Sequence, residues 1–283
     1  MKNSTVDIRP LSATTGAEIL GVDLADPLPD STYGEIRNAL LDYGVVFFRE
    51  QNLTPAQQLA FALRFGEVHS PRAMHTGFLP GLPITELRKE PGETRNIGGN
   101  WHTDNSFVPA PPLGSILLAR ELPACGGDTL FASMATAYDS LSDGLKQTLS
   151  GIRAVHAKWH CYEADQPDRQ LSPERKAELR REIGDLEAVH PVVIRHPESG
   201  RKCLYVNPTY TVRFDGWTVE ESRPLLDHLY HHAVRPENTC RFRWRDGSMA
   251  FWDNRSTWHY ALNDYHGSRR LLHRITVKGP PLS

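Results

Sequence analysis

The sequence predicts a mainly β protein with helices (α+β), in which a double-stranded β-helix (a jelly-roll or cupin-like barrel) is decorated by helices. Three observations point to this fold. Short apolar runs bounded by Gly and Pro dominate the C-terminal half, strands and helices alternate irregularly, and no Gly-rich phosphate loop follows a strand. Barrels of about this length often form one domain, so we treat residues 1–283 as a single domain.

The N-terminal part predicts short strands separated by glycines, followed by a helix. The helix is expected over 31–43, with Ser31 or Asp30 as its N-cap and Gly44 directly after its last turn. The apolar run 45–48 comes next and predicts a buried strand.

A second helix is expected between the N-cap Thr54 and Gly66, and a strand at 84–88 lies within a long loop region. Further strands are predicted at 115–119, 129–132, 191–195, 203–206, 241–244, 249–252 and 273–278. Further helices are predicted at 134–150, 172–187 and 219–233. Thr218 and Glu221 have the form of a capping box for the last of these helices, whereas Pro224 lies inside it and favours a later start.

The composition excludes several classes of protein. The net charge is −2 and the 32 Lys and Arg residues are mostly dispersed, so no nucleic-acid partner is indicated. The four cysteines form no C-x-x-C pair, which argues against a thiolate zinc site or a redox dithiol. Neither a signal peptide nor a stretch of 18 apolar residues is present, so a cytoplasmic protein without a membrane partner is expected.

The segment Asn100–Phe107 contains the first candidate site. His102 and Asp104 are two residues apart, and in a strand their side chains would project from one face. An imidazole and a carboxylate are two parts of a 2-His-1-carboxylate iron site, which leaves coordination positions open. Taken alone, this pair is better explained as the polar end of a strand.

Three later segments carry further candidates. Phe251–Tyr260 places His259 among aromatic residues, where a packed core histidine is the alternative. In a strand over 269–277, Arg270 and Arg274 would face the same side, and buried arginines require anionic partners. An exposed basic edge strand is the alternative there. Thr129 ends the G-G-D-T run, which reads either as a hairpin turn or as a ligand contact.

The order of these four segments resembles the TauD/TfdA (taurine and 2,4-dichlorophenoxyacetate dioxygenase-like) family of Fe(II)/2-oxoglutarate-dependent dioxygenases. The family pattern is W-H-[ST]-D, then G-G-D-T, then W-D-N-R-x-x-x-H, then R-R-x-x-x-R, and all four runs stand here in that order. The similarity extends over nearly the whole chain, including the opening I-R-P-L-S and the T-P-A-Q-Q-L run.

The resemblance implies cofactors and their ligands. It implies Fe(II), 2-oxoglutarate as cosubstrate and O₂, with succinate and CO₂ as products of an oxygenase that hydroxylates, and thereby in some cases cleaves, a small organic substrate. The residues that match iron ligands are His102, Asp104 and His259. The residues that match the 2-oxoglutarate site are Thr129, Trp252 and Arg270.

The resemblance also implies an anionic substrate, since Arg274 matches the arginine that meets its acidic group. Asn105 and Met74 are expected beside the same substrate. Taurine enzymes have a His and a Tyr where Pro71 and Met74 align, and an Asn where Gly98 stands, so taurine itself is disfavoured. A carboxylate, a phenoxyalkanoate, an alkyl sulfate or sulfonate, or a biosynthetic intermediate fits better. His69, Arg72 and His75 are alternative contacts, and relatives often form dimers or tetramers.

Rival interpretations rest on other histidines. The spacing of His228, His231 and His232 permits zinc on one helix face, although a solvated face is the simpler interpretation. His156 and His160 are interpreted as loop or pocket residues near the site. Two other functions also compete: a non-catalytic cupin-like metal- or ligand-binding protein, and a zinc hydrolase, which would leave Arg270 and Thr129 without a role.

Overall fold

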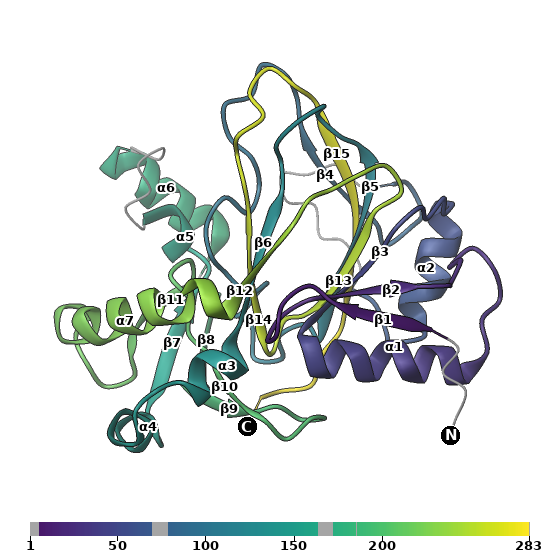
Figure 1. Ribbon diagram of the computed structural model, residues 1–283. Coiled ribbons are helices and arrows are strands. Elements are labelled where there is room, and N and C mark those ends of the chain that lie inside the picture. The colour runs from purple at the N-terminus through teal and green to yellow at the C-terminus, as the bar shows by residue number, and fades with distance from the viewer. Residues whose placement is uncertain (1–5, 70–78, 164–171, 185, 283) are drawn as a thin grey trace.

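A computed structural model describes residues 6–69, 79–163, 172–184 and 186–282. Two antiparallel sheets face each other as a jelly roll (Figure 1). The larger sheet has the order β1 (Asp7–Pro10), β2 (Ala17–Leu20), β3 (Val45–Phe48), β13 (Met249–Asp253), β5 (Gly114–Glu121), β15 (Arg270–Val277), β4 (Thr85–Lys89), with β2 and β3 parallel. The smaller sheet has the order β12 (Thr239–Phe242), β6 (Thr129–Ser133), β14 (Thr257–Ala261).

The apolar run of β3 is continuous because both faces of the larger sheet are covered. Val45 and Phe47 point between the sheets, where Phe47 stacks on Phe242 with 4.0 Å between ring centroids. Val46 and Phe48 point outward into a second core. Helices α1 (Asp30–Tyr43) and α2 (Pro55–Leu63) supply the other side of that core. A strand buried on both faces loses the polar alternation of an exposed strand.

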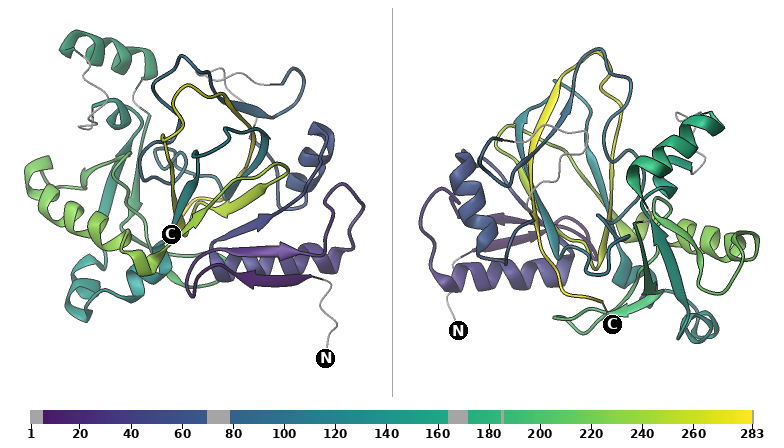
Figure 2. Two further views of the ribbon diagram at one scale, coloured as in Figure 1. Left: turned by 45° about the horizontal axis from the view of Figure 1, so that its top comes forward. Right: turned by 180° about the vertical axis from the view of Figure 1, so that it is seen from behind.

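The chain between β6 and β12 forms an insertion that covers the outer face of the smaller sheet (Figure 2). Trp258 points from β14 into its core. The described elements of the insertion are α3 (Met134–Asp139), α4 (Asp143–Leu149), β7 (Arg153–Ala157), α5 (His160–Glu163), α6 (Pro173–Ile183), β8 (Glu187–Pro191), β9 (Val193–Arg195), β10 (Lys202–Leu204), β11 (Thr211–Phe214), α7 (Val219–Ala233) and η1 (Pro236–Asn238).

Several predicted boundaries are wrong. The helix predicted over 134–150 is two helices, because the Ser142 side chain accepts from the Leu145 amide and starts α4 anew. Helix α1 follows Pro29 without a side-chain cap, so neither Ser31 nor Asp30 caps it. Helix α2 ends at Leu63, before Gly66. The helix predicted over 172–187 ends at Ile183. Strands β7, β8, β11 and β14 were not predicted.

Helix α7 starts where its capping box stands, in spite of Pro224. The Thr218 side chain accepts from the Glu221 amide, and the Glu221 carboxylate accepts from the Thr218 amide. Those two bonds fix the first turn, and Pro224 stays inside the helix. The predicted bounds 219–233 are therefore confirmed, and the later start that Pro224 favoured is wrong.

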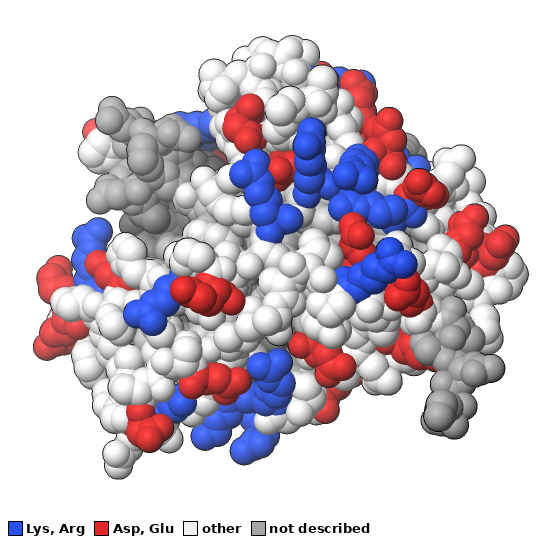
Figure 3. Space-filling view, in the orientation of Figure 1, with Lys and Arg blue, Asp and Glu red and all other residues white. Residues whose placement is uncertain are grey.

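Charges of both signs alternate over the face in Figure 3, in keeping with the net charge of −2. Among the described residues, no helix is both long and apolar enough to cross a membrane.

Candidate active site

Two histidines meet across a main-chain bridge at one end of the jelly roll. His102 and His259 exchange both main-chain hydrogen bonds, at 3.1 and 2.8 Å, and their ring centroids lie 4.0 Å apart. His259 pairs in register with Phe131 of β6, so its ring points between the sheets, whereas Trp258 points to the insertion. The backbone therefore sets the separation of the two imidazoles.

Asp104 joins these histidines from a turn. Its Oδ1 lies 3.6 Å from His102 Nε2 and 3.9 Å from His259 Nε2, and all three side chains are buried. The expected strand over His102 and Asp104 is absent: His102 forms an isolated bridge, and the chain turns at Asp104. Among the described residues, these three form the only group of three or more metal-ligand side chains whose ligand atoms lie within 4.8 Å of one another.

In His102 and Asp104, hydrogen bonds engage one polar side-chain atom and leave the other available as a metal ligand. His102 Nδ1 donates to the Asn100 carbonyl at 2.7 Å, so its Nε2 keeps a lone pair. Asp104 Oδ2 accepts from Ser115 Oγ at 2.7 Å, so Oδ1 faces the imidazoles. The free atoms are the ones that converge.

Electrostatics favours an ionised carboxylate at Asp104 and a neutral imidazole at His259. Burial by itself would raise the pKa of Asp104, but the neighbouring His102, His259 and Arg274 outweigh burial and hold that pKa far below its usual value. Burial, together with the neighbouring His102, lowers the pKa of His259. One carboxylate and two neutral imidazoles suit a divalent iron ion and leave part of its coordination sphere open.

A cavity adjoins the metal-ligand group and is lined by His102, Thr129, Trp252, His259, Arg270 and Arg274, among others. Arg270 is 6% exposed, yet its Nε and Nη2 have no hydrogen-bond partner among the described residues. Thr129 Oγ1 accepts from Trp244 Nε1 at 3.0 Å, which leaves the Thr129 hydroxyl proton to donate elsewhere. An anion in this cavity would find free donors on two side chains.

Neighbouring residues hold Arg270 in place. The guanidinium carbon of Arg270 makes cation–π contacts with two aromatic rings. It lies 5.8 Å from the ring centroid of Tyr265 and 5.7 Å from that of Trp244. Burial raises the pKa of Tyr265, while the charge of Arg270 and a hydrogen bond with it oppose that shift. Gly127 has φ 72°, and a Cβ there would lie 3.1 Å from Arg270 Nε, so glycine is required for the close approach.

Arg274 lies on the same side of β15 as Arg270. Leu272 stands between them and packs into the core between the sheets, which confirms the predicted shared face. Arg274 Nη1 lies 3.7 Å from Asp104 Oδ1, and Arg274 Nε has no hydrogen-bond partner among the described residues. Its side chain is 26% exposed, so it is the more accessible of the two arginines.

The remaining substrate-side predictions have mixed outcomes. Met74, like Pro71, Arg72 and His75, lies outside the described residues. Asn105 follows Asp104 with φ 51° and is not among the described residues that line the cavity. The main chain of His69 donates to the Thr276 carbonyl at 2.9 Å. Gly98, with φ 81°, packs on the metal-side ring: a Cβ there would lie 3.2 Å from His102 Cε1.

The rival histidines do not form a metal site. His232 Nε2 contacts the Ala137 carbonyl and the Ser140 hydroxyl at 3.0 and 2.9 Å, and His232 is buried rather than on a solvated face. His231 Nδ1 contacts the Asp227 carbonyl at 2.7 Å.

His156 and His160 do not line the described cavity either. His156 belongs to strand β7, not to a loop, and its Nδ1 lies 3.0 Å from Ser106 Oγ behind the metal turn. His160 begins α5. Strand β7 was not predicted, so its inward face could not be assigned.

The sequence did not single out four residues that shape the site. Ser115 and Asn254 contact Asp104, Tyr265 contacts Arg270, and the ring of Tyr210 lies 6.3 Å from that of His102. Asn254 could have been found, since it lies inside W-D-N-R. Nothing in the local pattern of the other three marks them.

Comparison with known proteins identifies one family. The family described as "Taurine catabolism dioxygenase TauD, TfdA family" matches residues 7–276. An alkylsulfatase of Acinetobacter baylyi is 39% identical over 97% of this chain and 85% of its own length. An alpha-ketoglutarate-dependent sulfate ester dioxygenase of Pseudomonas putida is 36% identical over 97% of this chain and 90% of its own length.

The fold agrees with a solved relative. The crystal structure of a taurine dioxygenase from Burkholderia xenovorans matches with a TM-score of 0.81 and 38% identity, covering 98% of this chain and 91% of that one. The family implies Fe(II), 2-oxoglutarate (alpha-ketoglutarate) and O₂, and the His-Asp-His group with its adjoining cavity suits them. The chain therefore belongs to the TauD/TfdA family and is a 2-oxoglutarate-dependent non-haem iron dioxygenase.

Proposed function

We propose that this dioxygenase oxidises an alkyl sulfate ester at the carbon that carries the ester oxygen. The observation that carries the proposal is the pair of guanidinium groups of Arg270 and Arg274, which lie four residues apart on one face of β15 and both line the cavity beside the His-Asp-His group. Each keeps nitrogens without a hydrogen-bond partner among the described residues. Two anions, one cosubstrate and one substrate, account for both.

The proposed ligands of iron are His102, Asp104 and His259. Two imidazole Nε2 atoms and one oxygen of an ionised carboxylate converge, which is the donor set that Fe(II) oxygenases use. The free Nε2 lone pair of His102 and the free Oδ1 of Asp104 support the same assignment.

The proposed site of 2-oxoglutarate lies deeper in the same cavity. Arg270 would pair with the carboxylate far from the metal, because its fork has two unpartnered nitrogens and little exposure to water. Thr129 would donate its free hydroxyl proton to that carboxylate. Trp252, whose ring lies 4.5 Å from that of His259, would wall the cosubstrate and exclude water.

Arg274 would hold the anionic group of the substrate, with Asn105 and Met74 on the substrate side. Its partial exposure fits a group that meets an incoming molecule. A sulfate ester is the proposed anion because the two relatives named above, an alkylsulfatase and a sulfate ester dioxygenase, match nearly all of this chain. A planar guanidinium fork matches two sulfate oxygens.

When bound, iron and 2-oxoglutarate supply an oxidant that replaces a C–H hydrogen with hydroxyl, consuming O₂ and releasing succinate and CO₂. Hydroxylation of the carbon beside the ester oxygen gives a hemiacetal sulfate. As its hydroxyl loses a proton, the C–O bond to sulfate breaks, and an aldehyde and inorganic sulfate remain. The contribution of Arg274 is to hold the sulfate end so that this carbon faces the metal side of the cavity.

The test supplies the purified protein with Fe(II), ascorbate, 2-oxoglutarate and O₂, and compares a medium-chain alkyl sulfate with an alkanesulfonate, a phenoxypropionate and taurine. We expect succinate and sulfate in equal amounts with the alkyl sulfate, and far less succinate with the others. Sulfate released without 2-oxoglutarate would mean a hydrolase. Succinate with another acid but not with the alkyl sulfate would overturn the substrate class alone.

A cytoplasmic location and a dimeric or tetrameric assembly stay predictions. Neither is needed for the chemistry proposed above.

A further inference from the structure

Asn254, in the W-D-N-R segment, has no role in the proposed function. Asn254 is 1% exposed and lies directly after β13. Its Oδ1 accepts from Trp252 Nε1 at 2.9 Å and from the Asp104 amide at 3.3 Å. Its main-chain carbonyl accepts from the Thr103 hydroxyl. Asn254 therefore contacts the metal turn through both its side chain and its main chain.

The amide of Asn254 also orients a serine. Asn254 Nδ2 donates to Ser115 Oγ at 3.3 Å, and Ser115 Oγ lies 2.7 Å from Asp104 Oδ2. A hydroxyl has a single proton, and an ionised carboxylate only accepts. Because the Ser115 oxygen accepts from Asn254, its proton points to Asp104. The direction of this chain of hydrogen bonds is fixed by the chemistry of its two ends.

These hydrogen bonds fix the orientation of the Asp104 carboxylate. Ser115 is fully buried in β5, so water does not compete for the bond. With Oδ2 engaged, the Asp104 oxygen that faces His102 Nε2 and His259 Nε2 is Oδ1. A carboxylate that turned both oxygens to an ion would occupy two coordination positions. A 2-oxo acid and O₂ together require three open positions.

We propose that Ser115 and Asn254 are positioning residues that make Asp104 a one-oxygen metal ligand. The proposal rests on the proposed function, since it takes Asp104 as a ligand. Partners that hold metal ligands from outside usually contribute about 10- to 100-fold to metal affinity. Ser115 acts directly on the carboxylate, and Asn254 acts through Ser115 and through the amide of Asp104.

The experiment measures the Mn(II) dissociation constant of the metal-free, full-length protein by calorimetric titration, without 2-oxoglutarate or substrate. We expect Ser115→Ala to weaken Mn(II) by about 10-fold or more. The matched control is Ser222→Ala, because Ser222 is equally buried, bonds to Phe214 and Thr218 and lies in α7. The control should stay within about twofold of wild type. Wild-type affinity in Ser115→Ala would overturn the proposal.

Two further variants separate the hydroxyl from packing. Ser115→Thr keeps a hydroxyl and should bind Mn(II) within about threefold of wild type, whereas loss equal to that of Ser115→Ala would assign the effect to packing and overturn the proposal. Asn254→Ser removes Nδ2 and tests the same chain from its other end, including the case in which Ser115→Ala does not fold. It should weaken Mn(II) by about threefold or more, and unchanged affinity would overturn the part assigned to Asn254.

A Co(II) absorption spectrum adds a signature that packing does not change. Freeing Oδ2 in Ser115→Ala should alter the ligand-field bands of the bound ion, because the number of oxygen donors changes. Identical bands in Ser115→Ala and wild type would contradict the one-oxygen role. None of these measurements requires turnover. An absence of succinate formation would therefore contradict the proposed function, whereas the metal-binding measurements would still test the roles of Ser115 and Asn254.

Discussion

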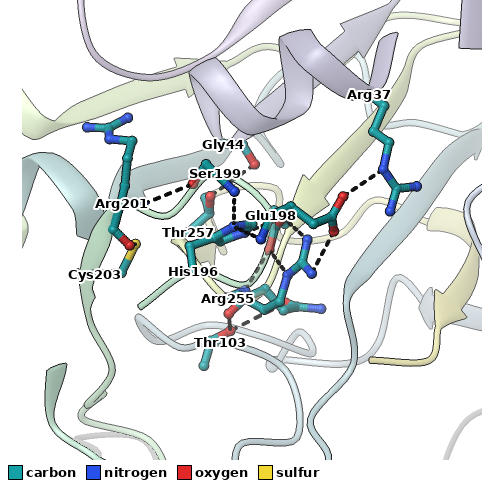
Figure 4. Close-up of polar contacts among 12 residues, drawn as sticks. Arg37, Gly44, Thr103, His196, Glu198, Ser199, Arg201, Cys203, Arg255 and Thr257 are labelled. Atoms are coloured by element: carbon teal, nitrogen blue, oxygen red, sulfur yellow. Dashed lines mark hydrogen bonds and ion pairs between the residues drawn. The ribbon is translucent and has the colours of Figure 1, made fainter. Parts of the chain in front are cut away.

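Two groups of charged side chains adjoin strands β13 and β14, and they differ in how their polar atoms are paired. In the ion-pair cluster, Arg255 donates to Asp253 through Nε at 2.9 Å and reaches Glu198 at 2.8 Å. Glu198 pairs with Arg37 of α1 at 2.7 Å, and His196 contacts Asp253 at 3.0 Å (Figure 4). Each member of this cluster has charged partners.

The metal-side group has the opposite character. His259 Nδ1, Arg270 Nε and Nη2, and Arg274 Nε are buried atoms without a hydrogen-bond partner among the described residues. An unpaired buried charge is costly, and a fold tolerates it where a ligand supplies the missing partner. The comparison teaches that the pairing of the charged atoms separates the structural cluster from the binding site.

The largest expected effect comes from a substitution in the ion-pair cluster. Arg255→Met leaves Asp253 buried without its main counter-charge, and we expect the free energy of unfolding to fall by about 3–5 kcal/mol. Denaturant unfolding followed by circular dichroism measures it. The control is Arg201→Met, since Arg201 forms an exposed pair with Asp139 at 3.3 Å and should change stability by less than about 1 kcal/mol. Equal losses in both variants would contradict the comparison.

Arg270→Leu changes the metal-side group and should have the opposite effect on the free energy of unfolding. Removing an unpaired buried charge should leave the unfolding free energy equal or higher, whereas the dissociation constant for 2-oxoglutarate should rise about 100-fold, or about 3 kcal/mol. Calorimetry on the Mn(II)-loaded protein measures binding. Arg269→Leu is the matched control, because Arg269 is the neighbouring arginine and pairs with Glu121 at 2.8 Å. A destabilised Arg270→Leu with normal 2-oxoglutarate binding would give Arg270 a structural role.

His156 sharpens the comparison, because its Nε2 also has no hydrogen-bond partner among the described residues although it lies behind the metal turn. A neutral imidazole carries a smaller cost than a guanidinium. Burial and the neighbouring His190 lower its pKa far below 6.5, so the unfolded chain binds its proton first as pH falls. The stability that His156 contributes is present above about pH 6.5 and is lost as pH falls towards the folded pKa.

Between pH 7.5 and 5.5 this group alone should cost wild type about 1.4 kcal/mol. His156→Gln should show a loss smaller by about that amount, measured by denaturant unfolding at both pH values. Parallel losses in the two proteins would show that His156 is not held neutral.

The smallest expected effect concerns the support of Arg270. Tyr265→Phe removes the hydroxyl that contacts Arg270 and keeps the ring beside it. We expect the dissociation constant for 2-oxoglutarate to rise about fivefold, near 1 kcal/mol, with Mn(II) affinity unchanged. Calorimetric titrations of each ligand measure the two constants separately. A loss of Mn(II) affinity of the same size would mean that Tyr265 supports the whole site rather than Arg270.

Much of the fold followed from local patterns in the sequence. The apolar run of β3 and the alternation in β15 were predicted because each depends on neighbours two residues apart. The break between α3 and α4 was missed because Ser142 competes for the backbone as a cap inside a helical pattern. The start of α7 was predicted correctly, because the capping box of Thr218 and Glu221 is a local signal that fixes the first turn in spite of Pro224.

The candidate site was predictable only where an ordered motif marks it. His102, Asp104 and His259 stand in such motifs, and the structure brings them together. Ser115 and Tyr265 do not, because the first reaches Asp104 through the pairing of β5 in the sheet and the second reaches Arg270 from a loop. Contacts of this kind depend on strand register, which a single sequence does not show. Met74 lies outside the described residues, so its predicted role stays a prediction.

The most direct measurement is a crystal structure of the protein with Mn(II) and 2-oxoglutarate under anaerobic conditions. The account predicts Mn(II) on His102 Nε2, His259 Nε2 and Asp104 Oδ1, with the far carboxylate of 2-oxoglutarate on Arg270 and Thr129. Mn(II) bound elsewhere, or a 2-oxoglutarate that leaves the Arg270 nitrogens unpaired, would contradict it.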